Sequence, residues 1–299
     1  MHKQINMIQS SLINEARKRY HERLVASGVL TIDENGVASN ADKSNASSKR
    51  IAKNLADIIG VPIREKMKGQ TLGTEFERIT AEFVAESFSL LNHVRPASWH
   101  VLRESQQGVF LGLSSFEQYS HLKELERCIA ESPKLATILG NDYFVKPDIV
   151  VYRDTLDDSE INADNDIVDE NTARLTALRA CNGGKYILHA DISAKWTMRS
   201  DRSQNTRTEA LNLIRNRKGH LPHIVCITAE PQPSRLASIA LGTGDIDCIY
   251  HAFLYELKTA MEKIVCEEGK DEDALELLNM MIEGKRIKDI SDLPLDLAV

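Results

Sequence analysis

The sequence predicts an α/β fold in which helices flank a mixed central sheet, with additional N- and C-terminal helices. Two observations favour this class. Strand-like apolar runs alternate with a helical pattern between residues 144 and 229, and apolar residues at helical spacing occupy both ends of the chain. Because no internal repeat, low-complexity tract or Gly/Ser-rich linker divides the 299 residues, we expect a single domain spanning 1–299.

Helices are expected to make up most of the N-terminal part, because apolar side chains recur there every three or four positions. A turn over Asp33–Gly36, flanked by short apolar runs, interrupts them. Gly60 and Pro62 end the second helix. The expected helices cover 12–26, 47–59, about 76–91 and a pair between about 116 and 138.

The centre of the chain alternates between strands and helices, and the C-terminal part is helical again. An acidic loop with a possible short helix separates the first two strands. After the last helix we expect only a polar tail. The strand candidates are 144–152, 186–196 and 223–229, and the helix candidates are 204–217, 250–265 and 272–282.

The composition, with 42% hydrophobic and 27% charged residues, is that of an ordinary globular protein. No apolar run approaches the roughly 20 residues that a membrane helix needs. The first residues lead into a polar stretch rather than a signal peptide, so we expect a cytoplasmic protein with no membrane partner. The five cysteines are scattered without a Cys-x-x-Cys pair, which argues against a disulfide framework or a zinc site.

Charge is unevenly distributed along the chain. The net charge of −7 argues against a surface that coats nucleic acid generally. However, 195–223 holds seven Lys/Arg against two acids, and 157–170 holds seven acids and no Lys or Arg. Two solvated faces would explain this pattern. The basic segment nevertheless begins at an unusual lysine.

Lys195 is unusual because it ends an apolar strand, where an isolated buried charge would be costly. Two carboxylates could compensate it: Asp148 in the preceding strand, and Glu209 in the following helical segment. Alternate residues of a strand share a face, so Asp148 and Lys195 can reach one pocket if their strands are neighbours. Carboxylates hold Mg²⁺ and an ammonium helps to activate water, so the three residues predict a divalent-metal phosphodiesterase site.

Each of these signals has a simpler explanation. Asp148 could be a turn residue after proline, Lys195 could protect a strand edge, and Glu209 could be a first-turn helix acid. Glu77 stands three residues after Thr74, which is the spacing of a helix capping box. Asp191 shares a strand face with Lys195 but is about 13 Å away along the strand, so we place it outside the site. Only the combination is specific.

The segment after the lysine is suited to reading DNA bases. Arginine makes bidentate contacts to guanine and aspartate accepts from cytosine. Arg199, Asp201 and Arg202 could therefore read G·C pairs in the major groove. The simpler alternative is a surface loop whose charges pair with one another.

These residues resemble the motif of the PD-(D/E)XK restriction endonucleases, and more closely that of a tetrameric subgroup with a rearranged motif. Pro147-Asp148, Ser193-Ala194-Lys195 and Glu209 match the subgroup's order of Pro-Asp, Lys and Glu. Most members of the wider family carry an acid where Ser193 stands. In the subgroup the following helix supplies that carboxylate, which would be Glu209 here. The likeness covers almost the whole chain.

The resemblance implies a restriction-endonuclease-like fold and a metal site for Mg²⁺, with two ions per active site. Asp148, Glu209 and the main-chain carbonyl of Ala194 would hold the metal. Lys195 would be catalytic, and Glu77 would be a further acid of the active site.

The resemblance also implies a type II enzyme that cuts double-stranded DNA at a palindrome with a CCGG core, namely G^CCGGC, to leave 5′-CCGG overhangs and 5′-phosphates. The expected partners are DNA, three further copies in a homotetramer, and a cognate DNA methyltransferase in the same bacterial cytoplasm. The rival hypotheses are a structure-specific repair or recombination nuclease and a non-catalytic DNA-binding regulator. The implied readers are Arg199, Asp201 and Arg202 for the core, and Asp42, Gln70 and Arg235 for the outer base pair.

Overall fold

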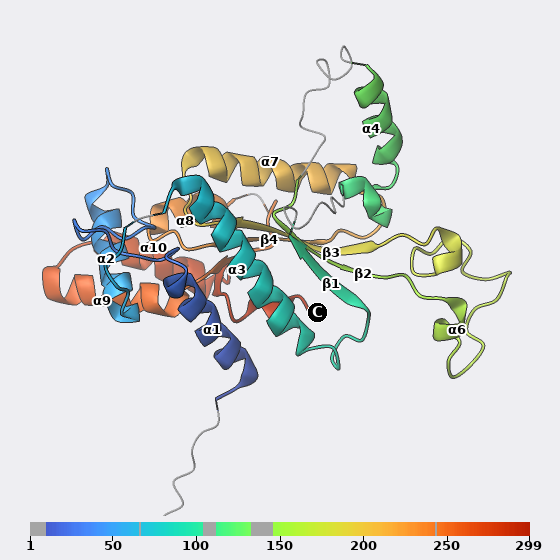
Figure 1. Ribbon diagram of the computed structural model, residues 1–299, viewed down its shortest axis with the longest axis horizontal. Helices are drawn as coiled ribbons and strands as arrows, with labels where there is room; N and C mark the ends of the chain where they lie inside the picture. The colour runs from blue at the N-terminus through green and yellow to red at the C-terminus, as the bar shows by residue number, and fades with distance from the viewer. Residues whose placement is uncertain (1–9, 66, 104–111, 133–145, 243) are drawn as a thin grey trace, which may run out of the picture.

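A six-stranded mixed sheet forms the centre of the computed structural model (Figure 1). The structure describes residues 10–65, 67–103, 112–132, 146–242 and 244–299. The first three strands are antiparallel neighbours, whereas the third to the sixth run parallel to one another. The predicted α/β class is therefore confirmed. In sheet order the strands are β1 (Trp99–Arg103), β2 (Ile149–Arg153), β3 (Ile187–Lys195), β4 (His223–Thr228), β5 (Cys248–His251) and β6 (Ile287–Asp289).

The two faces of the sheet have separate apolar cores, because side chains alternate along the strands. Ile149 and Val151 belong to the larger core, with α1, α2, α3 and the C-terminal helices. Val150 and Tyr152 point the other way into the smaller core, with α7 and the segment that leads into α4. Figure 1 shows α7 above the sheet and α1 below it. The helices named here are α1 (Leu12–Ala26), α2 (Ala46–Ile59), α3 (Gly69–Ser89), α4 (Leu122–Glu131) and α7 (Ser200–Asn216).

Several predicted helices are present within a residue or two of their expected bounds. Helix α1 covers the expected range, and the side chain of Ser11 caps it by accepting from the Asn14 amide at 3.2 Å. Helix α2 ends at Gly60, whose φ of 79° is left-handed and favours glycine. Helix α10 (Glu272–Glu283) also lies close to its expected range, whereas α8 (Pro233–Ala240) was not predicted.

Two helices begin earlier than predicted, and this changes the interpretation of two candidate site residues. Helix α3 begins at Gly69, so Thr74 and Glu77 lie inside it and the capping-box explanation of Glu77 is wrong. Helix α7 begins at Ser200, which places Glu209 in its third turn. The explanation of Glu209 as a first-turn acid is therefore wrong as well.

Three strands were not predicted. Strand β1 is half-buried along its whole length and shows no alternation, while β5 and β6 are only four and three residues long. The predicted helix from residue 250 instead follows β5 as α9 (Leu254–Glu268). The expected polar tail contains β6 and the short helix α11 (Leu293–Asp296).

The predicted helix pair between 116 and 138 is partly corrected. Two short 3₁₀ turns, Leu113–Ser115 and Glu117–Tyr119, precede α4. The break at Pro133 and the predicted strand start at Phe144 lie outside the described residues. The acidic loop contains the single-turn helix α6 (Asp158–Ile161).

The N-terminal helix is joined to the far edge of the sheet by a buried ion-pair network. The Arg17 guanidinium donates to both carboxylate oxygens of Glu256 at 2.8 and 2.7 Å, and to both of Asp289 at 2.8 Å. These residues lie on α1, α9 and β6. Because bidentate pairs of this kind are geometrically specific, they fix the three elements relative to one another.

No helix within the described parts of the chain is long and apolar enough to cross a membrane. All five cysteines are free thiols, of which Cys226 and Cys248 are buried and Cys181 and Cys266 are exposed.

Candidate active site and DNA-recognition surface

Asp148 and Lys195 meet where β2 begins and β3 ends. The two strands are antiparallel neighbours with Ile149 opposite Ile192. The Asp148 carboxylate oxygen Oδ2 accepts from the Lys195 ammonium at 2.6 Å and from the Ala194 amide at 2.8 Å. The predicted pairing of the lysine with Asp148 is therefore present in the structure.

The Lys195 ammonium keeps its charge although most of the side chain is buried. Burial alone would lower its pKa. Asp148 opposes this effect most strongly, followed by Glu209 and Glu77, so that the pKa of Lys195 is raised above its usual value. At neutral pH the site therefore presents a cation surrounded by carboxylates.

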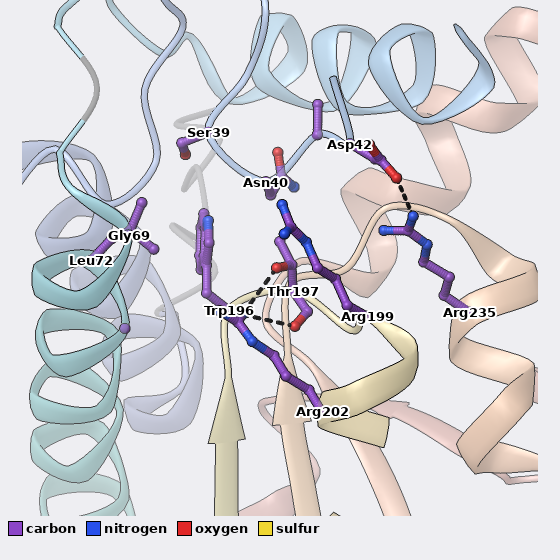
Figure 2. Close-up of a pocket in the computed structure, with 12 residues that line it drawn as sticks. Ser39, Asn40, Asp42, Gly69, Leu72, Trp196, Thr197, Arg199, Arg202 and Arg235 are labelled. Atoms are coloured by element: carbon purple, nitrogen blue, oxygen red, sulfur yellow. Dashed lines mark hydrogen bonds and ion pairs between the residues drawn. The ribbon is translucent and has the colours of Figure 1, made fainter. Parts of the chain in front are cut away.

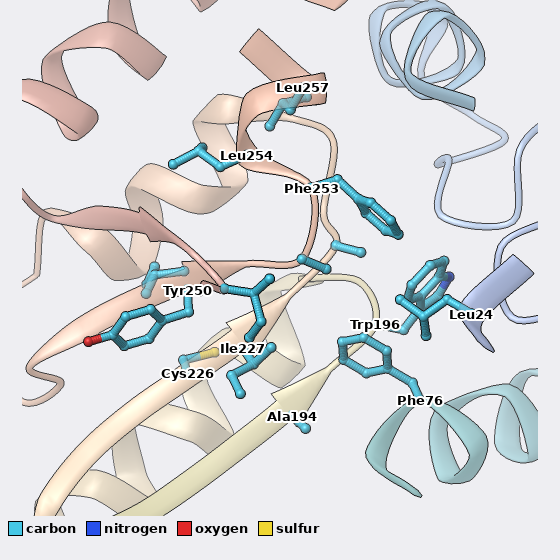
Figure 3. Packing of buried hydrophobic residues seen from close by; sticks show 14 of the residues in the cluster. Leu24, Phe76, Ala194, Trp196, Cys226, Ile227, Tyr250, Phe253, Leu254 and Leu257 are labelled. Carbon is cyan, nitrogen blue, oxygen red and sulfur yellow. The ribbon is translucent and has the colours of Figure 1, made fainter. Parts of the chain in front are cut away.

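The end of β3 is fixed by aromatic packing directly after the lysine. Trp196 is buried, and its ring meets the edge of Phe76 with ring centroids 5.1 Å apart. Figure 3 shows these rings side by side, next to Leu24 of α1. Since Phe76 precedes Glu77 in α3, this contact also brings the Glu77 carboxylate to the site.

Glu209 reaches the site because α7 lies over β3. Thr206, Ala210 and Leu213 form the buried face of α7, at the three- and four-residue spacing of a helix. Thr206 and Ser193 face each other, with their hydroxyl oxygens 3.4 Å apart. Glu209 lies one turn further along α7. It lines, together with Glu77, Ala194, Lys195 and other residues, an open pocket of about 290 Å³.

Asp191 is a carboxylate that the sequence argument placed outside the site. Its side chain is buried on the Lys195 face of β3, and its oxygen Oδ2 has no hydrogen-bond partner among the described residues. Burial raises the pKa of Asp191 well above its usual value, and the nearby charges of Glu209 and Asp148 add to this effect. Asp191 therefore belongs to the electrostatic surroundings of the site, because Glu209 extends toward it from α7. The distance between Lys195 and Asp191 along the strand could not show this.

Four of the six predicted DNA readers border a second pocket, of about 190 Å³, beside the first (Figure 2). Arg199 is the exposed residue before α7, and Arg202 in the first turn donates to the carbonyl and hydroxyl oxygens of Thr197, both at 3.2 Å. Across the pocket, Arg235 of α8 contacts the carboxylate of Asp42. Hydrogen bonds from Ser44 and the contact with Arg235 lower the pKa of Asp42 to about 2.

The other two predicted readers are placed differently. Gln70 is exposed in the first turn of α3 and borders the pocket of Lys195 rather than that of Arg235. Asp201 is exposed in the first turn of α7 and lines neither pocket. Arg202 lines both pockets, so the surface with the arginines is continuous with the site of Lys195.

The donor set at Lys195 fits Mg²⁺. Within the described parts of the chain no group of three or more His, Cys, Asp or Glu side chains lies close enough to form a metal cage. Mg²⁺ is usually held by one or two carboxylates together with water and substrate phosphate, not by such a cage. Asp148 and Glu209 are two carboxylates of this kind: Glu209 lines the open pocket, and Asp148 contacts Lys195 of the same pocket.

A mixed α/β sheet that presents an Asp–Lys pair where neighbouring strands begin and end, with a glutamate on the next helix, is the arrangement expected for the class of DNA endonucleases that the motif resembles. The family model described as the NgoMIV restriction enzyme matches residues 20–299. Type II restriction enzyme NgoMIV from Neisseria gonorrhoeae is 50% identical over 289 residues, which span 96% of this chain and 99% of that enzyme.

The chain belongs to the NgoMIV restriction enzyme family and is a type II restriction endonuclease that acts on DNA. The resemblance drawn from the motif is therefore confirmed. The rival hypotheses of a repair or recombination nuclease and of a non-catalytic DNA-binding regulator are therefore not supported.

Proposed function

We propose that the enzyme hydrolyses phosphodiester bonds of double-stranded DNA with Mg²⁺, two ions per active site, held by Asp148, Glu209 and the carbonyl oxygen of Ala194. The observation that carries this proposal is the Asp148–Lys195 contact at 2.6 Å beside Glu209 and Glu77. The Ala194 amide donates to Asp148, and the amide and carbonyl of one strand residue point to the same edge of the strand. The Ala194 carbonyl is thereby directed toward the Asp148 side.

In the reaction, a water oxygen attacks phosphorus and the P–O3′ bond breaks, which leaves a 5′-phosphate and a 3′-hydroxyl. Bound Mg²⁺ supplies Lewis-acid chemistry at the phosphate. Because its pKa is raised, Lys195 takes part as an ammonium that orients the water and offsets the charge growing on the phosphate oxygens. Glu77 supports the lysine by favouring its charged form.

We propose the palindrome G^CCGGC as the target, cut after the first G to leave a 5′-CCGG overhang. The core would be read by Arg199, Asp201 and Arg202, and the outer pair by Asp42, Gln70 and Arg235. The support is that all of these residues except Asp201 border the two adjoining pockets beside Lys195, and that arginine has a bidentate fit to guanine. Asp201 lies in the same first turn of α7 as Arg202.

The assembly proposed for this enzyme is a homotetramer, a pair of dimers, each chain forming one domain. A cognate DNA methyltransferase in the same bacterial cytoplasm would protect the host's own sites. Both proposals rest on the family resemblance and not on a contact within the chain.

The decisive experiment is digestion of a sequenced plasmid with and without Mg²⁺, followed by sequencing of the fragment ends. The proposal expects metal-dependent fragments that all begin with 5′-phosphorylated CCGG. Ends at unrelated sequences would contradict the target, and cleavage in the presence of a chelator would contradict the metal. Sedimentation of the purified protein tests the tetramer separately.

A further inference from the structure

Glu230 is a fully buried carboxylate directly behind the pocket of the arginines. It follows Ala229 after the end of β4, its side chain is 0% exposed, and Arg235 of α8 is near it. No step of the proposed cleavage uses it. A buried carboxylate is costly unless hydrogen bonds compensate it, so its contacts indicate what it does.

The two oxygens of Glu230 hold two different segments. Oε2 accepts from the amide of Met198 at 2.9 Å, and Oε1 accepts from the amide of Gln232 at 3.2 Å. Met198 immediately precedes Arg199, and Gln232 is the N-cap residue of α8, which carries Arg235. One carboxylate therefore joins the segment with the core readers to the helix with an outer reader.

The neighbouring backbone extends this connection to the third recognition segment. The carbonyl oxygen of Ala229 accepts from the Asn40 side chain at 2.9 Å, and the Ala229 amide donates to the Trp196 carbonyl at 3.2 Å. The Arg235 guanidinium lies 3.7 Å from Oε2 of Glu230 and contacts Asp42, two residues after Asn40. The segments around residues 40, 198 and 232 thus converge on residues 229–230.

These surroundings bring the pKa of Glu230 close to neutral pH. Burial raises its pKa to about 7, against the lowering effects of the Met198 amide, Arg235 and the Gln232 amide. Asp42 raises it slightly further. A further titratable neighbour is His251 of β5, whose ring contacts the main-chain oxygen of Glu230. Burial lowers the pKa of that histidine to about 4, so it is neutral in this range.

We propose that Glu230 is a positioning residue of sequence recognition: its carboxylate holds the core-reading segment at 199–202 and the outer reader Arg235 in one fixed register. This inference rests on the proposed function of those arginines. Only an ionised carboxylate offers a free acceptor on each oxygen, whereas an amide offers one acceptor oxygen in total. Loss of the second acceptor releases one of the two segments.

The test is the substitution Glu230→Gln, compared with Asp289→Asn as a matched control. Asp289 is likewise 0% exposed, accepts from a backbone amide in a turn, and faces an arginine, but it lies on β6. For each protein we would measure binding to a GCCGGC duplex and to duplexes with a changed outer pair, in Ca²⁺ to prevent turnover. Thermal melting and the Mg²⁺-dependent cleavage rate of pre-bound duplex complete the comparison.

The expected result for Glu230→Gln is a discrimination between the duplexes that falls about tenfold or more, as for loss of a hydrogen bond to a charged group. The cleavage rate of fully bound cognate duplex should change much less. The control should lose thermal stability but discriminate like wild type. Equal discrimination by Glu230→Gln and wild type would overturn the inference, as would an equal loss in both variants.

A pH series on the wild-type protein needs no variant and stands even if Glu230→Gln fails to fold. Protonation below pH 7 removes an acceptor, so discrimination should decline between pH 8 and 6. A flat profile in this range would contradict the inference. If the wild-type protein itself does not prefer GCCGGC at any pH, the proposed target fails instead, and the two failures are distinguishable.

Discussion

The substitution Lys195→Met removes the ammonium but keeps a side chain of similar length in the pocket. It leaves the Asp148 carboxylate with the hydrogen bond from the Ala194 amide, close to Glu209 and Glu77. The change therefore has two effects, the loss of an ion pair and the loss of a group that acts on the scissile phosphate.

The two effects differ in size. Removing one group that stabilises transition-state charge costs about 10²–10³ in rate, and positioning of the water is lost in addition. We expect the cleavage rate to fall at least about a thousandfold, which corresponds to about 4 kcal/mol of activation free energy. The side chains of Lys195 and Asp148 are 20% and 15% exposed, so the free energy of unfolding should fall by only about 1–3 kcal/mol.

A matched control is available on the edge strand β6. Lys288 pairs with Asp296 at the same distance of 2.6 Å, with side chains 29% and 35% exposed. Lys288→Met should cost about 1 kcal/mol or less in stability and leave the cleavage rate unchanged.

The assay is single-turnover cleavage of a duplex pre-bound to excess enzyme, started with Mg²⁺, with urea unfolding of each variant in parallel. A Lys195→Met enzyme that cuts within tenfold of the wild-type rate would refute the role given to the ammonium. So would a Lys288→Met enzyme with the same rate loss, because the effect would then follow from stability.

Three further outcomes are expected. Glu209→Gln should abolish Mg²⁺-dependent cleavage and weaken Mg²⁺ binding measured by calorimetry, while a gel-shift assay still detects the DNA complex; unchanged Mg²⁺ binding would exclude Glu209 as a ligand. Arg202→Ala should cost about 1–3 kcal/mol in binding to the cognate duplex and relax discrimination at one base pair, whereas a uniform loss on all sequences would make it a phosphate contact. The pKa of Asp289 is lowered because Arg17 and Ser291 outweigh the opposing effect of burial, so its stabilising contribution is present above about pH 3.8 and is lost as the pH falls below that value. Urea midpoints from pH 7 to 3 should show this loss in wild type and much less of it in Asp289→Asn; parallel curves would contradict it.

The pairing of Asp148 with Lys195 could be predicted from the sequence because it depends on local rules. A lysine at the end of an apolar strand requires a counter-charge, and alternation along β2 and β3 decides which acid can supply it. The same alternation places Ile149 and Val151 on the face opposite Val150.

Features that depend on packing between distant segments were not predictable in the same way. Strands β5 and β6 are too short to show a period of their own and form only because parallel neighbours complete their hydrogen bonds. The early starts of α3 and α7 have no side-chain N-cap to mark them. Asp191 is close to Glu209 because α7 crosses over β3. The sequence around residue 191 contains no pattern that predicts this crossing.

Crystals of the enzyme with uncleavable duplex and Mn²⁺ in place of Mg²⁺ offer the most direct test, because anomalous scattering locates the ion. The proposed site predicts two peaks bonded to oxygens of Asp148, Glu209, Ala194 and the scissile phosphate, at about the 2.0–2.1 Å typical of such ions. A peak bound by other residues, with Asp148 still turned to Lys195 and away from the metal, would contradict it.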